Sequence, residues 1–273
     1  MIDQEASTAA ATRAGLCSTR FCSSQSAVDR QSARQFDGRR RTMKFVTGTP
    51  MPIEKVIALS DEVDATASLL RHGLRVLESY AFAARDADVA FVCLAGGAEK
   101  LLKLSTGLHA LDTSGSWPPK AVMTGIGHDI VKLYDHVRDL IVQEAPSLST
   151  APGLIAELLD KVDNDPHIDQ VLEVLGTYAK KGRFYNLDHL ADHKQSDDSP
   201  KQLWEALHQG LLKLHPPLLM QLASVGQSQA ARAELNKLII CSITDWQELI
   251  TRAWRTGVFG SLAKQWAPLL LPT

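Results

Sequence analysis

The stretch FVCLAGGAEKLLKLSTGL, residues 91–108, carries the pattern on which our prediction of the fold class depends. Its apolar residues recur every three or four positions, which is the spacing of one helical face. Gly96 and Gly97 each cost about 1 kcal/mol relative to alanine in a helix, so we expect them to admit a closely packed neighbour. We therefore predict a central, tightly crossed helix. Its charged residues then lie at the rim of that contact: Glu99, Lys100 and Lys103.

Further apolar stripes with helical spacing run through the rest of the chain, at residues 63–81, 130–141, 168–178, 203–222 and 235–253. No segment of four to eight residues alternates cleanly between turn residues, so strand signals are almost absent. Pro216 and Pro217 should kink or break the stripe at 203–222. The sequence predicts an all-α protein, a bundle of about six or seven helices.

The chain divides into three parts by composition. Residues 1–42 are rich in Ser, Ala, Arg and Gln, with apolar residues too sparse to bury, so we expect a disordered tail; alternatively, Met43 is the native start. We expect a helical bundle over 43–195. The turn-rich stretch SDDSP at 196–200 then separates it from a C-terminal helical extension, 196–273, packed on the bundle.

The bulk composition limits the functional classes. The chain has 273 residues, 45% hydrophobic and 22% charged, with a net charge of −2, so no global field favours nucleic acid or an anionic membrane. Its four cysteines form no CxxC pair, and no apolar run approaches the ~20 residues of a membrane helix. We expect a cytoplasmic protein with no membrane or DNA partner, no metal and no cofactor.

A second motif, GIGHDIVKLYDHV at residues 125–137, begins with polar residues and continues with apolar periodicity. Asp129 therefore falls at a helix N-terminus, where a carboxylate caps free N–H groups and complements the helix dipole. His128 beside it is placed to hydrogen-bond to Glu99 of the preceding helix, as a buried polar tie. Glu99 and Lys103, four residues apart, form a favourable helical ion pair.

At these residues the chain resembles the HEPN superfamily (higher eukaryotes and prokaryotes nucleotide-binding). Ala98-Glu99-Lys100-Leu101-Leu102-Lys103 and Gly127-His128-Asp129-Ile130 match the family's two short motifs in the same order, and the resemblance covers roughly residues 60–190. It implies a helical protein of a defence or stress system that binds or cleaves RNA. It also implies a homodimer.

The segment KKGRFYNLDHLADHK, residues 180–194, is similar to the Arg-to-His motif of HEPN ribonucleases. The resemblance implies that Arg183 stabilises the phosphate charge and that His189 acts as acid or base, in a reaction that needs no metal. Arg183-Phe184-Tyr185 also resembles the Arg-Tyr-Pro turn of non-catalytic members, which gives Tyr185 a supporting role.

Other interpretations of the same residues stay open. In a purely structural one, Gly182 caps the preceding helix, Arg183 pairs with an acid, and three apolar residues anchor the turn in the core: Phe184, Tyr185 and Leu187. In a metal-binding one, His189 and His193 share a helical face, although no third ligand is evident.

An alternative function is a non-enzymatic interaction or oligomerisation module. Such a module would use the C-terminal hairpin and its tryptophans, Trp204, Trp246, Trp254 and Trp266. Three of these tryptophans fit apolar helical faces, so the same pattern also favours a place in the core.

Overall fold

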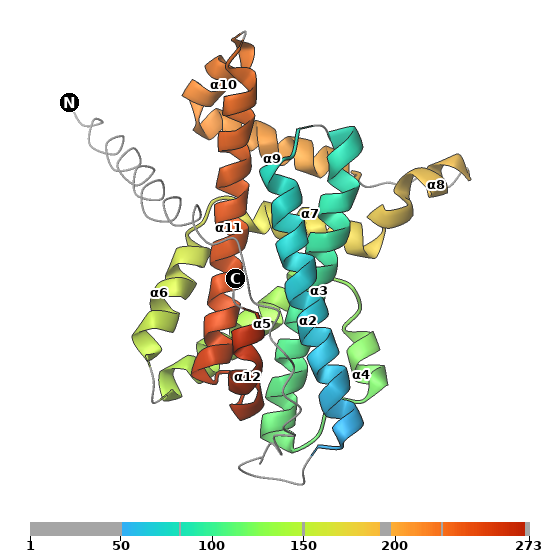
Figure 1. Cartoon of the computed structure of the whole chain (residues 1–273), viewed down its shortest axis with the longest axis vertical. Helices are drawn as coiled ribbons and strands as arrows, with labels where there is room; N and C mark the ends of the chain where they lie inside the picture. The colour runs from blue at the N-terminus through green and yellow to red at the C-terminus, as the bar shows by residue number, and fades with distance from the viewer. Residues whose placement is uncertain (1–50, 82, 149–150, 192–197, 225, 271–273) are drawn as a thin grey trace, which may run out of the picture. The chain divides into compact units, whose positions relative to one another are not determined.

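A computed structural model describes residues 51–270, apart from 82, 149–150, 192–197 and 225. Within these ranges the chain forms α-helices and short 3-10 turns, with no β-strand (Figure 1). The predicted all-α fold is confirmed. The tail expected to be disordered, residues 1–42, lies outside the described residues.

The six apolar stripes correspond to the helices that carry most of the core. These are α2 (Ile53–Glu78), α3 (Ala83–Ser114), α5 (Ile130–Glu144), α7 (Ile168–Lys180), α9 (Pro200–Leu214) and α11 (Ser228–Thr256). The fifth stripe continues into α10 (Pro216–Ala223), so the chain does break at the proline pair, as predicted. The remaining elements are α4 (Lys120–Gly125), α6 (Pro152–Asp163), α8 (Tyr185–Leu190), α12 (Ser261–Trp266) and the 3-10 turns η1 (Ala145–Ser147), η2 (Gly182–Phe184) and η3 (Ala267–Leu269).

Helix α3 is central, since it packs against α2, α5, α7 and α12. Its crossing with α2 is tight at two glycines. A Cβ atom on Gly97 would lie 2.8 Å from Leu70 Cγ, and one on Gly73 would lie 2.5 Å from Leu94 Cγ. The expectation that glycine admits a close neighbour is confirmed for Gly97. At Gly96 the space is ordinary, because its Cβ would lie 3.5 Å from Leu69 Cδ1.

Helix α11 fastens the C-terminal segment to the rest of the core. It packs against α2, α6 and α7, and the described residues belong to one compact unit. Trp246 and Trp254 of α11 are buried, as is Trp204 of α9, and Trp254 Nε1 donates a 2.7 Å hydrogen bond to Ser105 Oγ on α3. The core interpretation of these three tryptophans is confirmed, so they do not form an exposed docking face.

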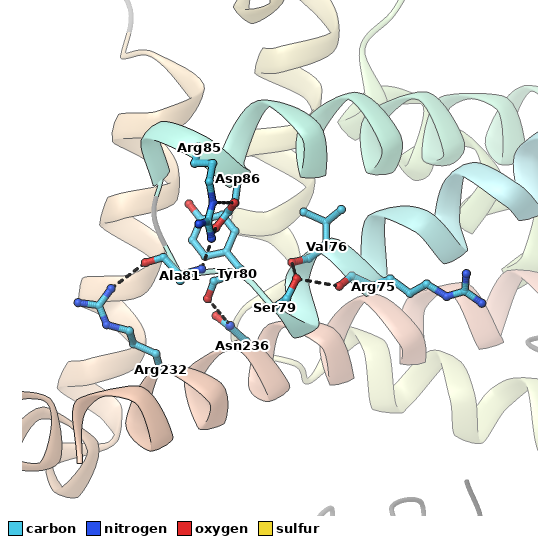
Figure 2. A network of polar contacts seen from close by, with 9 residues as sticks. All are labelled: Arg75, Val76, Ser79, Tyr80, Ala81, Arg85, Asp86, Arg232 and Asn236. Carbon is cyan, nitrogen blue, oxygen red and sulfur yellow. Dashed lines mark hydrogen bonds and ion pairs between the residues drawn. The ribbon is translucent and has the colours of Figure 1, made fainter. Parts of the chain in front are cut away.

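The turn between α2 and α3 is held by polar side chains from α11 (Figure 2). Asn236 Nδ2 donates to the Tyr80 carbonyl at 2.8 Å, and Arg232 Nη1 donates to the Ala81 carbonyl at 2.7 Å. The Ala81 amide in turn donates to Asp86 Oδ2 at 3.0 Å. The two carbonyl groups of this partly buried turn are therefore satisfied by α11, which is distant in sequence, and these bonds hold the α2–α3 hairpin against α11.

Candidate functional site

The predicted tie between α3 and the start of α5 is present. His128 Nδ1 lies 2.9 Å from Glu99 Oε1, and Lys103 Nζ donates to the same carboxylate oxygen at 2.8 Å. An ionised carboxylate only accepts hydrogen bonds, so Nδ1 of His128 carries the hydrogen in this contact. Gly127, with a φ of +71°, makes the left-handed turn that brings His128 to α3.

Asp129 links the same corner to the end of α7. It caps α5 by accepting from the Lys132 amide at 3.3 Å, as the sequence predicted, and it also accepts from Lys180 Nζ at 3.0 Å. Burial alone raises the pKa of Asp129, but the hydrogen bonds from Lys180 and the Lys132 amide outweigh it and hold that pKa below its usual value. These hydrogen bonds therefore connect α3, the start of α5 and the end of α7.

These ties lie at the surface, which corrects the expectation of a buried one. The His128 side chain is 64% exposed and Glu99 is 19% exposed. Lys100 pairs with Glu62 of α2, also on the surface. The charged residues of α3 therefore sit at the rim of its contacts, where the apolar face ends. Exposed ion pairs contribute about 0–1 kcal/mol each, so they orient helices more than they stabilise them.

The segment that follows α7 leaves the bundle, and we call residues 180–191 the arm. It comprises the last residue of α7, Lys181, the η2 turn, α8 and Ala191, and α8 extends away from α3 and α7 (Figure 1). Gly182 does not cap α7 in a left-handed conformation, which corrects that interpretation. It is needed because a Cβ there would lie 2.2 Å from Pro200 Cγ at the start of α9. The start of the arm therefore packs closely against the start of α9 at Gly182.

The arm carries an exposed apolar ridge, formed by Phe184, Leu187 and Leu190. Their exposed fractions are 55%, 61% and 79%. The expectation that Phe184 and Leu187 anchor the turn in the core is therefore wrong. Leu187 lies three positions from both Phe184 and Leu190, so large exposed apolar side chains follow one another along this short element.

Arg183 and His189, the residues expected to be catalytic, are both exposed on the arm, whereas Tyr185 is half-buried. Among the described residues, neither Arg183 nor His189 makes a hydrogen bond or ion pair with the Glu99–His128 cluster. Arg183 is linked to that cluster only along the backbone: it lies three residues after Lys180, which contacts Asp129. The structure therefore brings together Glu99, Lys103, His128 and Asp129, and leaves Arg183 and His189 facing solvent.

Basic side chains gather at the root of the arm, and we call them the collar: Lys132, Lys180, Lys181 and Arg183. Lys132 Nζ and Lys180 Nζ both approach Asp129 Oδ2, at 4.0 and 3.0 Å. The Lys132 side chain is 82% exposed, and Lys181 and Arg183 are exposed as well. Asp129 therefore balances part of the charge of Lys132 and Lys180.

The metal-binding interpretation gains no support. Within the described ranges, no three His, Cys, Asp or Glu side chains gather as metal ligands would. His193, proposed as a partner of His189, lies outside the described residues.

Sequence reasoning missed the Asp129–Lys180 contact, the collar and the exposure of the ridge. The i, i+3, i+6 spacing of Phe184, Leu187 and Leu190 is visible in the sequence, but a buried stripe has the same spacing. The close approach of Gly182 to Pro200 was also missed, because it involves a residue 18 positions away.

Comparison with known proteins yields no relative: no family model, curated protein or solved structure matches this chain. In the part of the chain that the structure describes, no helix combines the length and apolarity that crossing a bilayer demands.

Proposed function

We propose that this protein is a non-enzymatic helical docking module whose arm binds a partner through the ridge. The observation that carries the proposal is the exposure of three large apolar side chains in the η2 turn and α8: Phe184, Leu187 and Leu190. Fully burying a side chain of this size stabilises by about 1.5–3 kcal/mol, and the fold leaves this stabilisation unused. A partner surface would recover it.

The root of the arm supports this role. Gly182 packs on Pro200 and Lys180 pairs with Asp129, so the chain is held where it leaves α7. The Glu99–His128 tie holds the start of α5, and with it Asp129. A docking element held at its root loses less conformational freedom on binding than a loose loop does.

Size fractionation of cell extracts tests this function. We expect the wild-type chain in an assembly larger than its own mass or in the particulate fraction, and a Leu187→Glu/Leu190→Glu variant at its own mass. A matched control, Leu219→Glu/Met220→Glu, changes two exposed apolar residues of α10 in the same way and should behave as wild type. If the wild-type chain migrates at its own mass, or if the control dissociates equally, the proposal fails.

A second candidate function is favoured by the Glu99–His128 contact. On this proposal the chain is a cytoplasmic, HEPN-like protein of a defence or stress system that binds or cleaves RNA, as a homodimer. Arg183, exposed on the arm, would supply a phosphate contact, the kind of contact that dominates nucleic-acid affinity. Arg183 would stabilise the phosphate charge and His189 would transfer a proton. The Glu99–His128 contact expected from the resemblance is the geometric support for this candidate.

Incubation of the purified protein with total RNA tests the second candidate. We expect an Arg183→Ala/His189→Ala variant to lose binding and cleavage. The variant Arg255→Ala/His136→Ala, which removes an exposed arginine and histidine elsewhere, is the matched control. Absence of RNA binding by the wild type, or equal activity of wild type and arm variant, would reject the RNA function.

A further inference from the structure

We propose that neutral histidines hold α9 against the rest of the core, and that α9 loosens at mildly acidic pH when these histidines take up protons. The inference does not depend on the docking function of the arm. It starts from His208 within α9, which is half-buried, and from His167 directly before α7, of which 8% is exposed. Histidine is the side chain whose charge ordinarily changes between pH 5 and 8.

His208 packs against the turn between α2 and α3. Its ring lies edge-on to Trp204 of α9, with ring centres 5.3 Å apart and planes at 86°, and its centre is 6.0 Å from that of Tyr80 in the turn. Arg232 of α11 reaches the same turn, because its guanidinium donates to the Ala81 carbonyl (Figure 2). A proton added to His208 would therefore lie among aromatic rings and within electrostatic range of a second cation.

The surroundings of His208 favour its neutral form. Burial lowers the pKa of His208; Glu205 of the same helix and the Trp204 backbone oppose this, whereas Arg232 lowers the pKa further. Tyr80 stays uncharged in this range, because burial raises the pKa of its hydroxyl. The other charged groups at this corner are carboxylates of α3 that act on Tyr80, Asp86 and Asp88. The neutral imidazole is thus the form that the fold accommodates.

A second contact joins the start of α7 to the end of α9. His167 lies directly before α7 and His215 directly after α9, and a Cβ on Gly210 of α9 would lie 3.8 Å from Gln170 Oε1 of α7. Burial lowers the pKa of His167; Asp165, whose carboxylate accepts from the His167 amide at 2.7 Å, opposes this, and the charge of His215 lowers the pKa further. Protonation of both histidines would therefore place two cations at this end of the α7–α9 contact.

Acid weakens both contacts of α9 in the same pH range. Because folding lowers the pKa of His208 and of His167, their neutral rings contribute stability that is complete above the unfolded value of about 6.5 and is lost as pH falls through the folded values. The turn between α2 and α3 keeps its hydrogen bonds from Asn236 and Arg232 of α11, neither of which titrates in this range. We therefore expect α9 to loosen while the α2–α3 hairpin stays on α11.

Hydrogen exchange of the full chain, measured by mass spectrometry at about pH 7.5 and about pH 5.5 and corrected for the intrinsic exchange rate at each pH, tests the inference. Protection of α9 should fall between the two pH values by at least about threefold more than protection of residues 98–108 in the middle of α3. His208→Phe keeps a ring that takes up no proton, and His215→Gln removes the cation facing His167. In the double variant His208→Phe/His215→Gln, the extra fall should disappear.

A matched control, His72→Phe/His136→Gln, changes two exposed histidines of α2 and α5 in the same way and should respond as wild type. Circular dichroism checks the folding of each variant, and His208→Gln replaces His208→Phe if the latter is unfolded. Wild-type protection of α9 that falls no more than that of α3 would overturn the inference. So would a fall that persists undiminished in the double variant, or one that disappears equally in the control.

Discussion

Replacing Gly97 with alanine tests the packing of α3 on α2. The added Cβ would lie 2.8 Å from Leu70 Cγ, 2.9 Å from Cδ2 and 3.1 Å from the Leu70 backbone nitrogen. Leu70 is buried within α2, and its backbone amide cannot rotate away as the end of a flexible side chain can. The two helices must therefore separate slightly or shift along each other.

Two opposing effects set the magnitude. Overpacking in a core costs about 1–3 kcal/mol, whereas replacing glycine with alanine in a helix gains about 1 kcal/mol. Gly97→Ala should therefore lower the free energy of unfolding by up to about 2 kcal/mol. At the neighbouring Gly96 the new Cβ would make only an ordinary 3.5 Å contact. Gly96→Ala should instead raise the free energy of unfolding by up to about 1 kcal/mol.

Urea unfolding followed by tryptophan fluorescence and far-ultraviolet circular dichroism measures both variants. Because the helix-propensity gain is common to the two, their difference isolates the overpacking and should be about 1–3 kcal/mol. If both variants stabilise the protein equally, the close crossing at Gly97 does not exist and our account of the α2–α3 pair is wrong.

Three further substitutions test the remaining contacts. Ser105→Ala leaves the buried Trp254 N–H without its acceptor and should cost about 1–3 kcal/mol in thermal or urea unfolding; an unchanged stability would show that this hydrogen bond is dispensable. Asn236→Ala removes the donor to the Tyr80 carbonyl, with a similar expected loss, and faster hydrogen exchange in the α2–α3 turn should accompany it. Asp129 has a lowered pKa in the folded state, because its hydrogen bonds outweigh burial. Its ionised form therefore stabilises the fold above the unfolded pKa, and this stabilisation is lost as pH falls through the folded pKa. Asp129→Asn should therefore destabilise at pH 7, and its difference from wild type should close below about pH 4; a difference that persists at low pH would contradict this.

The helices of the core were predictable from the sequence because their pattern is local. Each apolar stripe repeats the helical period over three or more turns, and the proline pair after His215 ends α9 where expected. The Glu99–His128 contact was also predictable, since it joins the middle of α3 to a capped helix start nearby in the chain. Only its exposure was misjudged, because sequence spacing does not fix how deep a helix face lies.

The arm was not predictable in the same way. Its direction depends on Gly182 packing against Pro200 and on Lys180 meeting Asp129, which lies 51 positions earlier. Apolar residues at helical spacing, such as Phe184, Leu187 and Leu190, predict a buried helix face when only the local sequence is considered. The triplet is exposed because the tertiary contacts described above involve Lys180 and Gly182, before the triplet begins.

The claim on which our account depends is that the ridge takes no part in holding the fold together and is free for a partner. The free energy of unfolding of Leu187→Glu/Leu190→Glu, measured in urea beside the wild type, tests it most directly. We predict a value within about 0.5 kcal/mol of wild type, as for surface substitutions, whereas Leu101→Ala in the core of α3 should lose about 2–5 kcal/mol. A loss in the ridge variant as large as that of Leu101→Ala would mean that the ridge is packed in solution, and would contradict the account.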